Sequence, residues 1–493
     1  MHTSPLYVAI DLGSNSFHML IAREVTGGIQ TIDKIKRKVR LASGLDANNN
    51  LSHEAMHRGW HCLRLFVERL QDIEPQNIRV VGTATLRKAK NIQAFIEKAE
   101  QILNHKIEII SGEQEAQTIY QGVAHTSGGG QNRLVVDIGG ASTEVIVGEA
   151  FTPKILHSFN LGCVTWLNKY FQEGILSKEN FSQAILAAKD IFLPYADQYK
   201  TFHWDICVGA SGTVQAIQEI MLAQGMDEII TLPKLQRMQR QALNYTHINE
   251  LDIDGLTMER ALVFPSGLAI LIALFELLDI ESMCLAGGAL REGILYEMIP
   301  EMQHKDIQAR TLNSMQEQFH LDADYGQIVA DYCQKLLAQC PTDWLKEKSA
   351  SALLHAAAIL HEIGKNISYK KDGEHAAYIL CHLDLPGFTS SQQKLLASIV
   401  KQYRDQLTDI PKQHALSTLS ATRILQLLRI AVILCYRRDP SKIPDIQLIA
   451  SETNMITLQF PADWLAHNPL MEYKLKEEID HQQDVGWHLI LKN

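Results

Sequence analysis

The stretch AIDLGSNSFHMLIA, residues 9–22, breaks an apolar run with Asp-Leu-Gly-Ser-Asn and then resumes it. The stretch VVDIGGASTEVIVG, residues 135–148, follows the same plan of apolar strand, aspartate, glycine turn with small polar residues, and second apolar strand. Asp11 and Asp137 hold equivalent positions in the two copies. This repetition predicts that the first part of the chain is a duplicated structure.

The size and composition of the chain limit the classes of protein to which it can belong. A chain of 493 residues exceeds what one hydrophobic core supports, so roughly two to four domains are expected. Hydrophobic content of 46% and charged content of 21% are typical of a soluble globular protein. The net charge of −10 argues against nucleic acid or an anionic membrane as a partner. Positive charge for an anionic substrate must therefore be concentrated in one cleft.

The cysteines and apolar segments indicate a cytoplasmic protein. The 8 cysteines are scattered without a CxxC pair, which favours buried thiols in a reducing compartment over a disulfide framework or a zinc site. The N-terminus reaches a strand-like segment at once, which leaves no space for a signal peptide. The most apolar run, residues 261–278, contains Pro265 and is typical of a buried core helix.

Strand and helix patterns alternate in the first 304 residues and then give way to helix. Period-two and apolar segments predict strands, and helical spacing predicts a helix over 52–71 with Ser52 as its N-cap. After about residue 304 the pattern is almost continuously helical, with one hairpin-like pair over 445–460. The fold class is therefore α/β with a mainly helical C-terminal region. The predicted domains are 1–125, 126–304, 305–440 and 441–493.

Each repeated turn has the chemistry of a phosphate-binding loop. Glycines allow positive φ and let backbone N–H groups crowd round an anion. Side-chain donors follow directly after them. Two such loops facing each other would grip a phosphate chain from both sides. The predicted phosphate-binding residues of the two loops are Gly13, Ser14, Asn15, Gly139, Gly140, Ser142 and Thr143.

The two aspartates indicate a metal ion. Asp11 and Asp137 would repel phosphates unless they hold a cation, and Mg²⁺ prefers one or two carboxylates together with substrate oxygens. Glu144 is a third candidate ligand. A single turn of this kind is usually an ordinary β-turn, but two in-frame copies, both followed by hydroxyl residues, favour the phosphate and Mg²⁺ interpretation.

Five motifs together resemble a known family. DLGSNSFHMLIA, ISGEQEA, DIGGASTE, GASGT and GGALREG occur in the order and spacing of the exopolyphosphatase/guanosine pentaphosphate phosphatase family. IKRKVRLASGL, GCVTWL and VFPSGLAILIA are most similar to its guanosine pentaphosphate phosphatase branch (GppA). One departure is Ala141, where the common motif has a third glycine. The family lies within the actin-like (ASKHA, ribonuclease H-like) superfamily, so the resemblance implies two actin-like domains flanking a cleft.

The resemblance also implies an activity. The expected reaction removes the 5′-terminal phosphate of guanosine pentaphosphate to give the tetraphosphate alarmone of the stringent response, with exopolyphosphatase activity beside it. The alternative is an exopolyphosphatase that releases phosphate processively from inorganic polyphosphate. A nucleotide sensor without turnover is a third possibility, and the intact set of acidic residues argues against it.

By resemblance, the catalytic base falls on Glu115 in ISGEQEA. Glu113 is its competitor, and a glutamate in a first helical turn otherwise complements the helix dipole. Arg87, in TATLRKAKN, is expected to hold phosphate oxygens and transition-state charge. Glu144 is expected to take part in catalysis as well as in metal binding.

A third glycine turn, GASGT at 209–213, opens a predicted helix whose N-terminus could accept an anion, although small residues also permit close packing. Its candidate residues are Gly209, Ser211 and Gly212. Arg260 resembles a family position that reaches the cleft. Arg291 is expected to be a structural ion-pair partner.

Two groups of histidines have no expected catalytic role. His18 follows the first turn and is expected to pack. In the helical region, His361 and Glu362 resemble a degenerate HD-type phosphohydrolase pair, which favours a scaffold or dimerisation role over a second metal centre. A homodimer is predicted on this basis.

Overall fold

The computed structural model describes residues 4–25, 28–128, 130, 132–299, 306–347, 349–411, 413–451 and 455–492. Its contacts divide the chain into an N-terminal unit and a C-terminal unit that begins at Asp306. Each unit has its own hydrophobic core. In the described part of the chain, no helix is long and apolar enough to cross a membrane.

The N-terminal unit begins with a five-stranded sheet in the order β3-β2-β1-β4-β5. β1 pairs antiparallel with β2 and parallel with β4, so the first glycine turn joins a hairpin at the sheet centre. Helices α1 and α3 pack on this sheet, and the Ser52 side chain caps α1 as predicted. The elements are β1 Leu6–Leu12, β2 Ser16–Val25, β3 Gly28–Lys38, α1 His53–Val67, β4 Ile78–Gly82, α2 Ala84–Lys88, α3 Ile92–Leu103 and β5 Ile107–Ile109.

The second sheet of this unit repeats the topology of the first. Its order is β10-β9-β6-β7-β8, in which β6 pairs antiparallel with β7 and parallel with β9. β6 thus corresponds to β1 and β7 to β2, which confirms the duplication predicted from the repeated turn. The strands are β6 Asn132–Ile138, β7 Thr143–Glu149, β8 Thr152–Phe159, β9 Ile206–Gly209 and β10 Cys284–Leu285.

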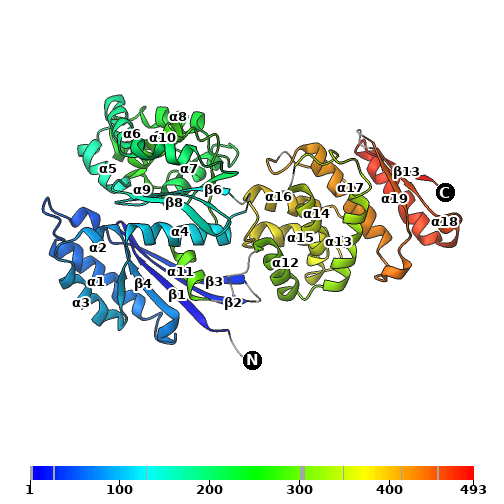
Figure 1. Ribbon diagram of the computed structural model, residues 1–493, viewed down its shortest axis with the longest axis horizontal. Coiled ribbons are helices and arrows are strands. Elements are labelled where there is room, and N and C mark those ends of the chain that lie inside the picture. Colours follow the sequence, from blue (N-terminus) through cyan, green and yellow to red (C-terminus); the bar gives the residue numbers. More distant parts are fainter. Residues whose placement is uncertain are drawn as a thin grey trace. The chain divides into compact units, whose positions relative to one another are not determined.

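Helices cover the second sheet and link it to the first. α10 carries the apolar run of the sequence and is almost entirely buried, as predicted for a core helix. α4 and α11 contact each other, while α11 also contacts β1 and α4 contacts β7 and β8 (Figure 1). The helices are α4 Gly112–Thr126, α5 Cys163–Tyr170, α6 Lys178–Lys200, α7 Gly212–Ala223, α8 Leu232–Ala242, α9 Met258–Ala261, α10 Phe264–Leu278 and α11 Leu290–Met298.

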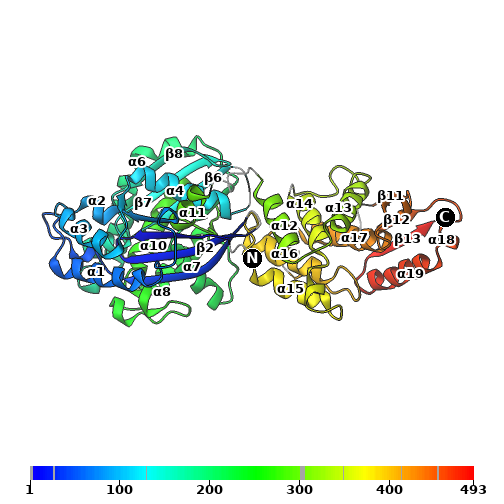
Figure 2. The ribbon, with the colours of Figure 1, turned by 90° about the horizontal axis from the view of Figure 1, so that it is seen from below.

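The C-terminal unit is mainly helical and ends in a small sheet. β11 and β12 form the predicted hairpin, and β13 adds parallel to β12, with α19 against β13 (Figure 2). One hydrophobic cluster extends from Leu312 to Leu489 through both parts. The elements are α12 Ile307–Gln318, α13 Ala323–Leu337, α14 Ser349–Leu360, α15 Asp372–His382, α16 Ser390–Lys401, α17 Thr418–Leu434, β11 Gln447–Ala450, β12 Met455–Gln459, α18 Trp464–His467, α19 Pro469–Asp484 and β13 His488–Lys492. The boundaries near 125 and 440 remain predictions.

Candidate active site

The two repeated turns meet in the N-terminal unit. A Cβ atom built on Gly140 would lie 3.0 Å from Ser14 Cβ and 3.4 Å from Asn15 N. Asp11 and Asp137 belong to the ends of the corresponding strands β1 and β6, immediately before these turns. The structure therefore brings together the residues of both predicted phosphate loops.

The reason for the glycines differs from the one expected. Among the described residues, positive φ is found at six glycines, and none of them belongs to the predicted phosphate turns. These glycines serve close approach instead: a Cβ on Gly13 would lie 2.8 Å from the Ser16 carbonyl, and Gly140 faces the opposite turn. The expectation of positive φ was wrong, because the turns need space rather than left-handed backbone.

Backbone hydrogen bonds hold each turn in place. The Asn15 carbonyl accepts from Val39 N and Arg40 N, at 3.1 and 2.8 Å. In the second turn, the Gly139 and Gly140 carbonyls accept from N–H groups at the start of α5. These bonds fix the backbone of both turns, and within the second turn the Gly139 N–H donates to the Ser142 carbonyl at 2.9 Å.

The hydroxyl residues of the turns play different parts. Thr143 is fully buried and donates its hydroxyl to the Leu161 carbonyl at 2.8 Å, so its side chain braces the second turn. Ser142 hydrogen-bonds the carboxylate of Glu144. Ser14 is also buried, against the second turn. The predicted contact of Thr143 with phosphate therefore fits poorly, because the hydroxyl proton of its side chain is already donated to the Leu161 carbonyl.

Burial and mutual repulsion raise the pKa values of the acidic residues. Burial raises the pKa of Asp11 to about 7; Arg291 opposes this rise and Glu115 adds to it. Burial, with the charges of Glu115 and Asp11, raises the pKa of Asp137 well above its ordinary value. Glu144 faces Asp137 in the strand register, and burial again raises its pKa. The site therefore gathers negative charge that a cation would stabilise.

Glu115, the predicted catalytic base, lies in the first turn of α4. Its side chain is buried, whereas Glu113 in the same turn is exposed. Arg87 Nη1 lies 3.0 Å from Glu115 Oε2 and donates to the Ile110 carbonyl at 2.8 Å. Burial raises the pKa of Glu115, while the Arg87 charge lowers it. These two contacts use one nitrogen of Arg87, so the guanidinium keeps further donors for an anion.

The third turn is joined to Arg260. A Cβ on Gly212 would lie 1.9 Å from Arg260 Nη2, so the guanidinium rests against the N-terminus of α7. Ser211 Oγ is buried and has no hydrogen-bond partner among the described residues. Gly209 permits packing, since its Cβ would meet Val214 and Met283 at 2.6 and 2.8 Å. Ser211, Gly212 and Arg260 thus form one candidate anion site, and Gly209 has a packing role.

Two residues of the site, Ser158 and Arg291, were missed or misjudged from sequence, while for His18 the expected packing role stays a prediction. Ser158 on β8 donates to Glu144 Oε1 at 2.7 Å, a contact that depends on the β7–β8 register. Arg291 forms no ion pair with a described residue, and its charge instead lowers the pKa of both Asp11 and Asp137. His18 pairs with Asp11 across the hairpin, and burial together with Arg291 lowers its pKa to about 3. His18 is therefore neutral at physiological pH.

The acidic residues suit a metal that takes part of its shell from substrate. In the described ranges, no group of three or more His, Cys, Asp or Glu is placed to hold a metal ion alone. Asp11 Oδ1 is buried without a hydrogen-bond partner in the described structure. The charges of Asp11 and Glu115 also raise the pKa of Asp137. Such a pair fits Mg²⁺, which completes its octahedral shell with water and phosphate oxygens.

In the C-terminal unit, the HD-like pair of His361 and Glu362 makes contacts with other protein groups. Glu362 accepts from Arg438 Nη2 at 2.7 and 2.9 Å and also pairs with Lys365. His361 is buried, with its Nδ1 2.6 Å from the Ala358 carbonyl. Since two cations occupy the Glu362 carboxylate, the arrangement favours the structural role expected for this pair over metal binding.

Two lobes of the same sheet topology, whose glycine turns meet beside buried acidic residues, define a two-lobed α/β protein with a candidate phosphate site. The Ppx/GppA phosphatase family model matches residues 20–302, and the model for domain III of these phosphatases matches residues 307–479. The chain belongs to the Ppx/GppA phosphatase family.

Relatives and solved structures agree with this assignment. The chain is 59% identical to the guanosine-5′-triphosphate,3′-diphosphate pyrophosphatase of Photobacterium profundum, over 99% of this chain and 98% of that one. It is 58% identical to the enzyme of the same name from Vibrio cholerae, over 99% of each chain. The fold resembles that of an exopolyphosphatase from Cytophaga hutchinsonii (24% identity, TM-score 0.55, 59% of this chain and 97% of that chain). It also resembles the Aquifex aeolicus family member (20% identity, TM-score 0.51, 61% of this chain and 100% of that chain).

Proposed function

We propose that this phosphatase hydrolyses the 5′-terminal phosphate of guanosine pentaphosphate, giving guanosine tetraphosphate and inorganic phosphate. The observation that carries this proposal is the buried acidic centre where two phosphate turns meet, with Arg87 contacting Glu115. The names of relatives that match almost the whole chain support the choice of nucleotide.

Glu115 acts as the general base. A water in line with the terminal phosphorus gives a proton to Glu115 and forms the new P–O bond, while the bond to the bridging oxygen breaks. Burial raises the pKa of Glu115 and makes its carboxylate a better proton acceptor, while the Arg87 charge favours the ionised form. The free donors of Arg87 stabilise charge on the transferred phosphoryl oxygens.

Asp11 and Asp137 hold the metal in this proposal, with Glu144 beside them. Mg²⁺ would neutralise phosphate charge and orient the oxygens. The turn N–H groups around Gly13, Ser14 and Asn15 bind from one side, and that of Gly140 binds from the other. The N–H of Gly139 is not available to phosphate, because it donates to the Ser142 carbonyl at 2.9 Å. Arg260 and the N-terminus of α7 add a further anion contact.

Exopolyphosphatase activity is the second candidate function, because the family model includes both enzymes and the turns recognise only phosphate.

We also propose that the protein is a cytoplasmic homodimer. All 8 cysteines are free, as a reducing compartment requires. The helical C-terminal unit exposes Ile367, Tyr369 and Tyr378, which offer apolar area for an interface. Light scattering after gel filtration measures the oligomeric state directly.

The test is phosphate release with Mg²⁺ from guanosine pentaphosphate and from long-chain polyphosphate in parallel. Glu115→Gln should lower kcat by about 10²–10⁴-fold. Glu113→Gln, two residues earlier in the same helical turn and exposed, is the matched control and should keep the wild-type rate. Full activity in Glu115→Gln would overturn the assignment of the base. Preference for polyphosphate would place the protein with the exopolyphosphatases.

A further inference from the structure

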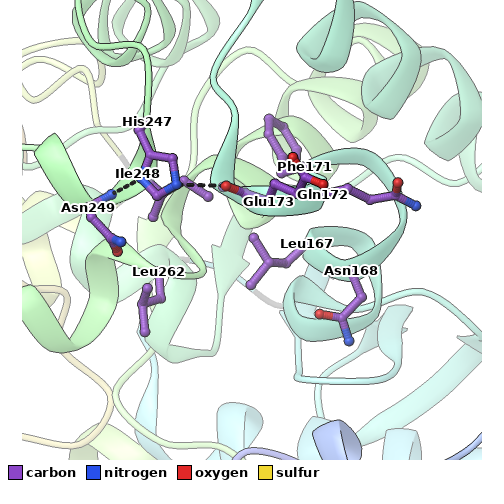
Figure 3. Close-up of a pocket in the computed structure, with 10 residues that line it drawn as sticks. Leu167, Asn168, Phe171, Gln172, Glu173, His247, Ile248, Asn249 and Leu262 are labelled. Atoms are coloured by element: carbon purple, nitrogen blue, oxygen red, sulfur yellow. Dashed lines mark hydrogen bonds between the residues drawn. The ribbon is translucent and has the colours of Figure 1, made fainter.

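A cavity of about 620 Å³ opens in the second lobe. Figure 3 shows the residues that line it. Its apolar wall is formed by Leu167, Phe171, Ile248 and Leu262. Polar residues complete the lining: Asn168, Gln172, Glu173, His247 and Asn249. A cavity of this size, with apolar walls and a few polar groups, is suited to one flat polar ring system with its sugar.

The polar rim of the cavity is fixed by hydrogen bonds. Asn249 N donates to His247 Nδ1 at 3.1 Å, so the ring proton is on Nε2, which donates to the Glu173 carbonyl at 2.6 Å. Glu173 and Gly174 both have positive φ, and a Cβ on Gly174 would lie 2.6 Å from the His247 ring. A non-glycine residue in this conformation is strained. The structure thus holds Glu173 at the rim by a tight fit.

The cavity lies at a suitable distance from the phosphate turns. The first N–H groups of α5 bind the Gly139 and Gly140 carbonyls, and the last turn of α5 supplies Leu167 and Asn168. Eight helical residues span about 12 Å, which is comparable to the reach of an extended nucleotide from its terminal phosphate to its base. Leu262, which lines the opposite side of the cavity, follows Arg260 of the candidate phosphate site by two residues. Both walls are therefore continuous with the candidate phosphate site.

The polar side chains that line the cavity are complementary to the hydrogen-bonding groups of guanine rather than of adenine. The side-chain amides of Asn168, Gln172 and Asn249 make no hydrogen bond with a described residue, and they can donate or accept. A carboxylate such as Glu173 only accepts, and the N1–H and N2–H groups of guanine are adjacent donors. Adenine presents an acceptor at N1 and would be repelled. We propose that this cavity binds the guanine base of the substrate, with Glu173 reading its N1–N2 edge; this rests on the proposed function.

Two variants test the cavity by different routes. Glu173→Gln removes a charged acceptor from an exposed position, and Leu262→Trp fills the space. Kd values for guanosine tetraphosphate and for inorganic tripolyphosphate, measured by calorimetry, separate base from phosphate recognition. Each variant should weaken nucleotide binding about tenfold or more and leave tripolyphosphate unchanged, because Glu173→Gln removes a charged hydrogen-bond acceptor and Leu262→Trp occupies the space of the base. Glu179→Gln, also exposed in the second lobe, is the control.

The outcomes are distinct from those for the proposed function. Unchanged nucleotide affinity in both variants, or equal weakening of nucleotide and tripolyphosphate, would overturn the assignment of the cavity. The wild-type protein could instead bind guanosine tetraphosphate through Glu173 and release no phosphate from guanosine pentaphosphate. That result would overturn the proposed activity and support the assignment of the cavity. Circular dichroism verifies that Leu262→Trp is folded.

Discussion

Gly140 of the second turn lies directly against Ser14 of the first, so that a methyl group added to Gly140 would lie only 3.0 Å from Ser14 Cβ. This contact joins the two copies of the duplicated hairpin at the point where phosphate would bind. Few real Cβ atoms tolerate this spacing next to another side chain, so the glycine sets the separation of the two turns.

Gly140→Ala should therefore push the turns apart by a few tenths of an ångström. The expected result is a fall in kcat/KM of about tenfold or more, because small misplacements in a phosphate site are costly. Steady-state kinetics with guanosine pentaphosphate measure it. Ala141→Gly, a one-methyl change at the next position, should have little effect. Equal loss in both variants would show that the turn as a whole, rather than the Gly140–Ser14 contact, is sensitive.

The second prediction concerns pH. The Arg87 charge lowers the pKa of Glu115, against burial, which raises it. Arg87→Gln removes the lowering effect, so the base should lose its proton only at higher pH. The acid limb of the kcat/KM profile should accordingly move to higher pH. Lys88→Gln, the neighbouring cation on α2, should leave the limb in place. A limb that does not move in Arg87→Gln would mean that Glu115 is not the titrating group.

The repeated turn made much of this architecture predictable. Asp11 and Asp137, each between two apolar strands, identified the duplication, and the sheet orders confirm it. Ser158 was not predictable, because its contact with Glu144 depends on strand register, which a single sequence does not give. Arg291 was misjudged for a related reason. Its effect on Asp11 depends on how α11 sits across β1, a long-range contact without a local sequence signal.

The third prediction uses the contact between Gly212 and Arg260. A methyl group at Gly212 would meet the guanidinium at 1.9 Å. Since a long flexible side chain can move aside, Gly212→Ala should raise KM several-fold without loss of thermal stability. Arg260→Ala should raise KM as well. The double variant should be little worse than Arg260→Ala alone, because both changes remove the same interaction. Strictly additive effects would contradict the shared site.

The last prediction concerns stability in the C-terminal unit. Burial lowers the pKa of His361 to about 4, from 6.5 in an exposed state. The unfolded chain therefore takes up a proton below pH 6.5, whereas the folded protein does so only near pH 4. Stability falls as pH drops through this window, by roughly 1.4 kcal/mol per pH unit and by about 3 kcal/mol in all. Hydrogen exchange of α14 peptides between pH 7 and pH 4.5 reports this loss.

His361→Phe should flatten this dependence, since phenylalanine has no proton to gain and can keep edge contacts with Tyr325 and Tyr403, whose ring centres lie 5.4 and 5.2 Å from that of His361. The variant loses the hydrogen bond to Ala358, so its stability at pH 7 should be lower by about 1 kcal/mol. His488→Gln, an exposed histidine of β13, is the matched control and should keep the wild-type slope. If His361→Phe kept that slope too, the acid sensitivity of the unit would belong to its carboxylates.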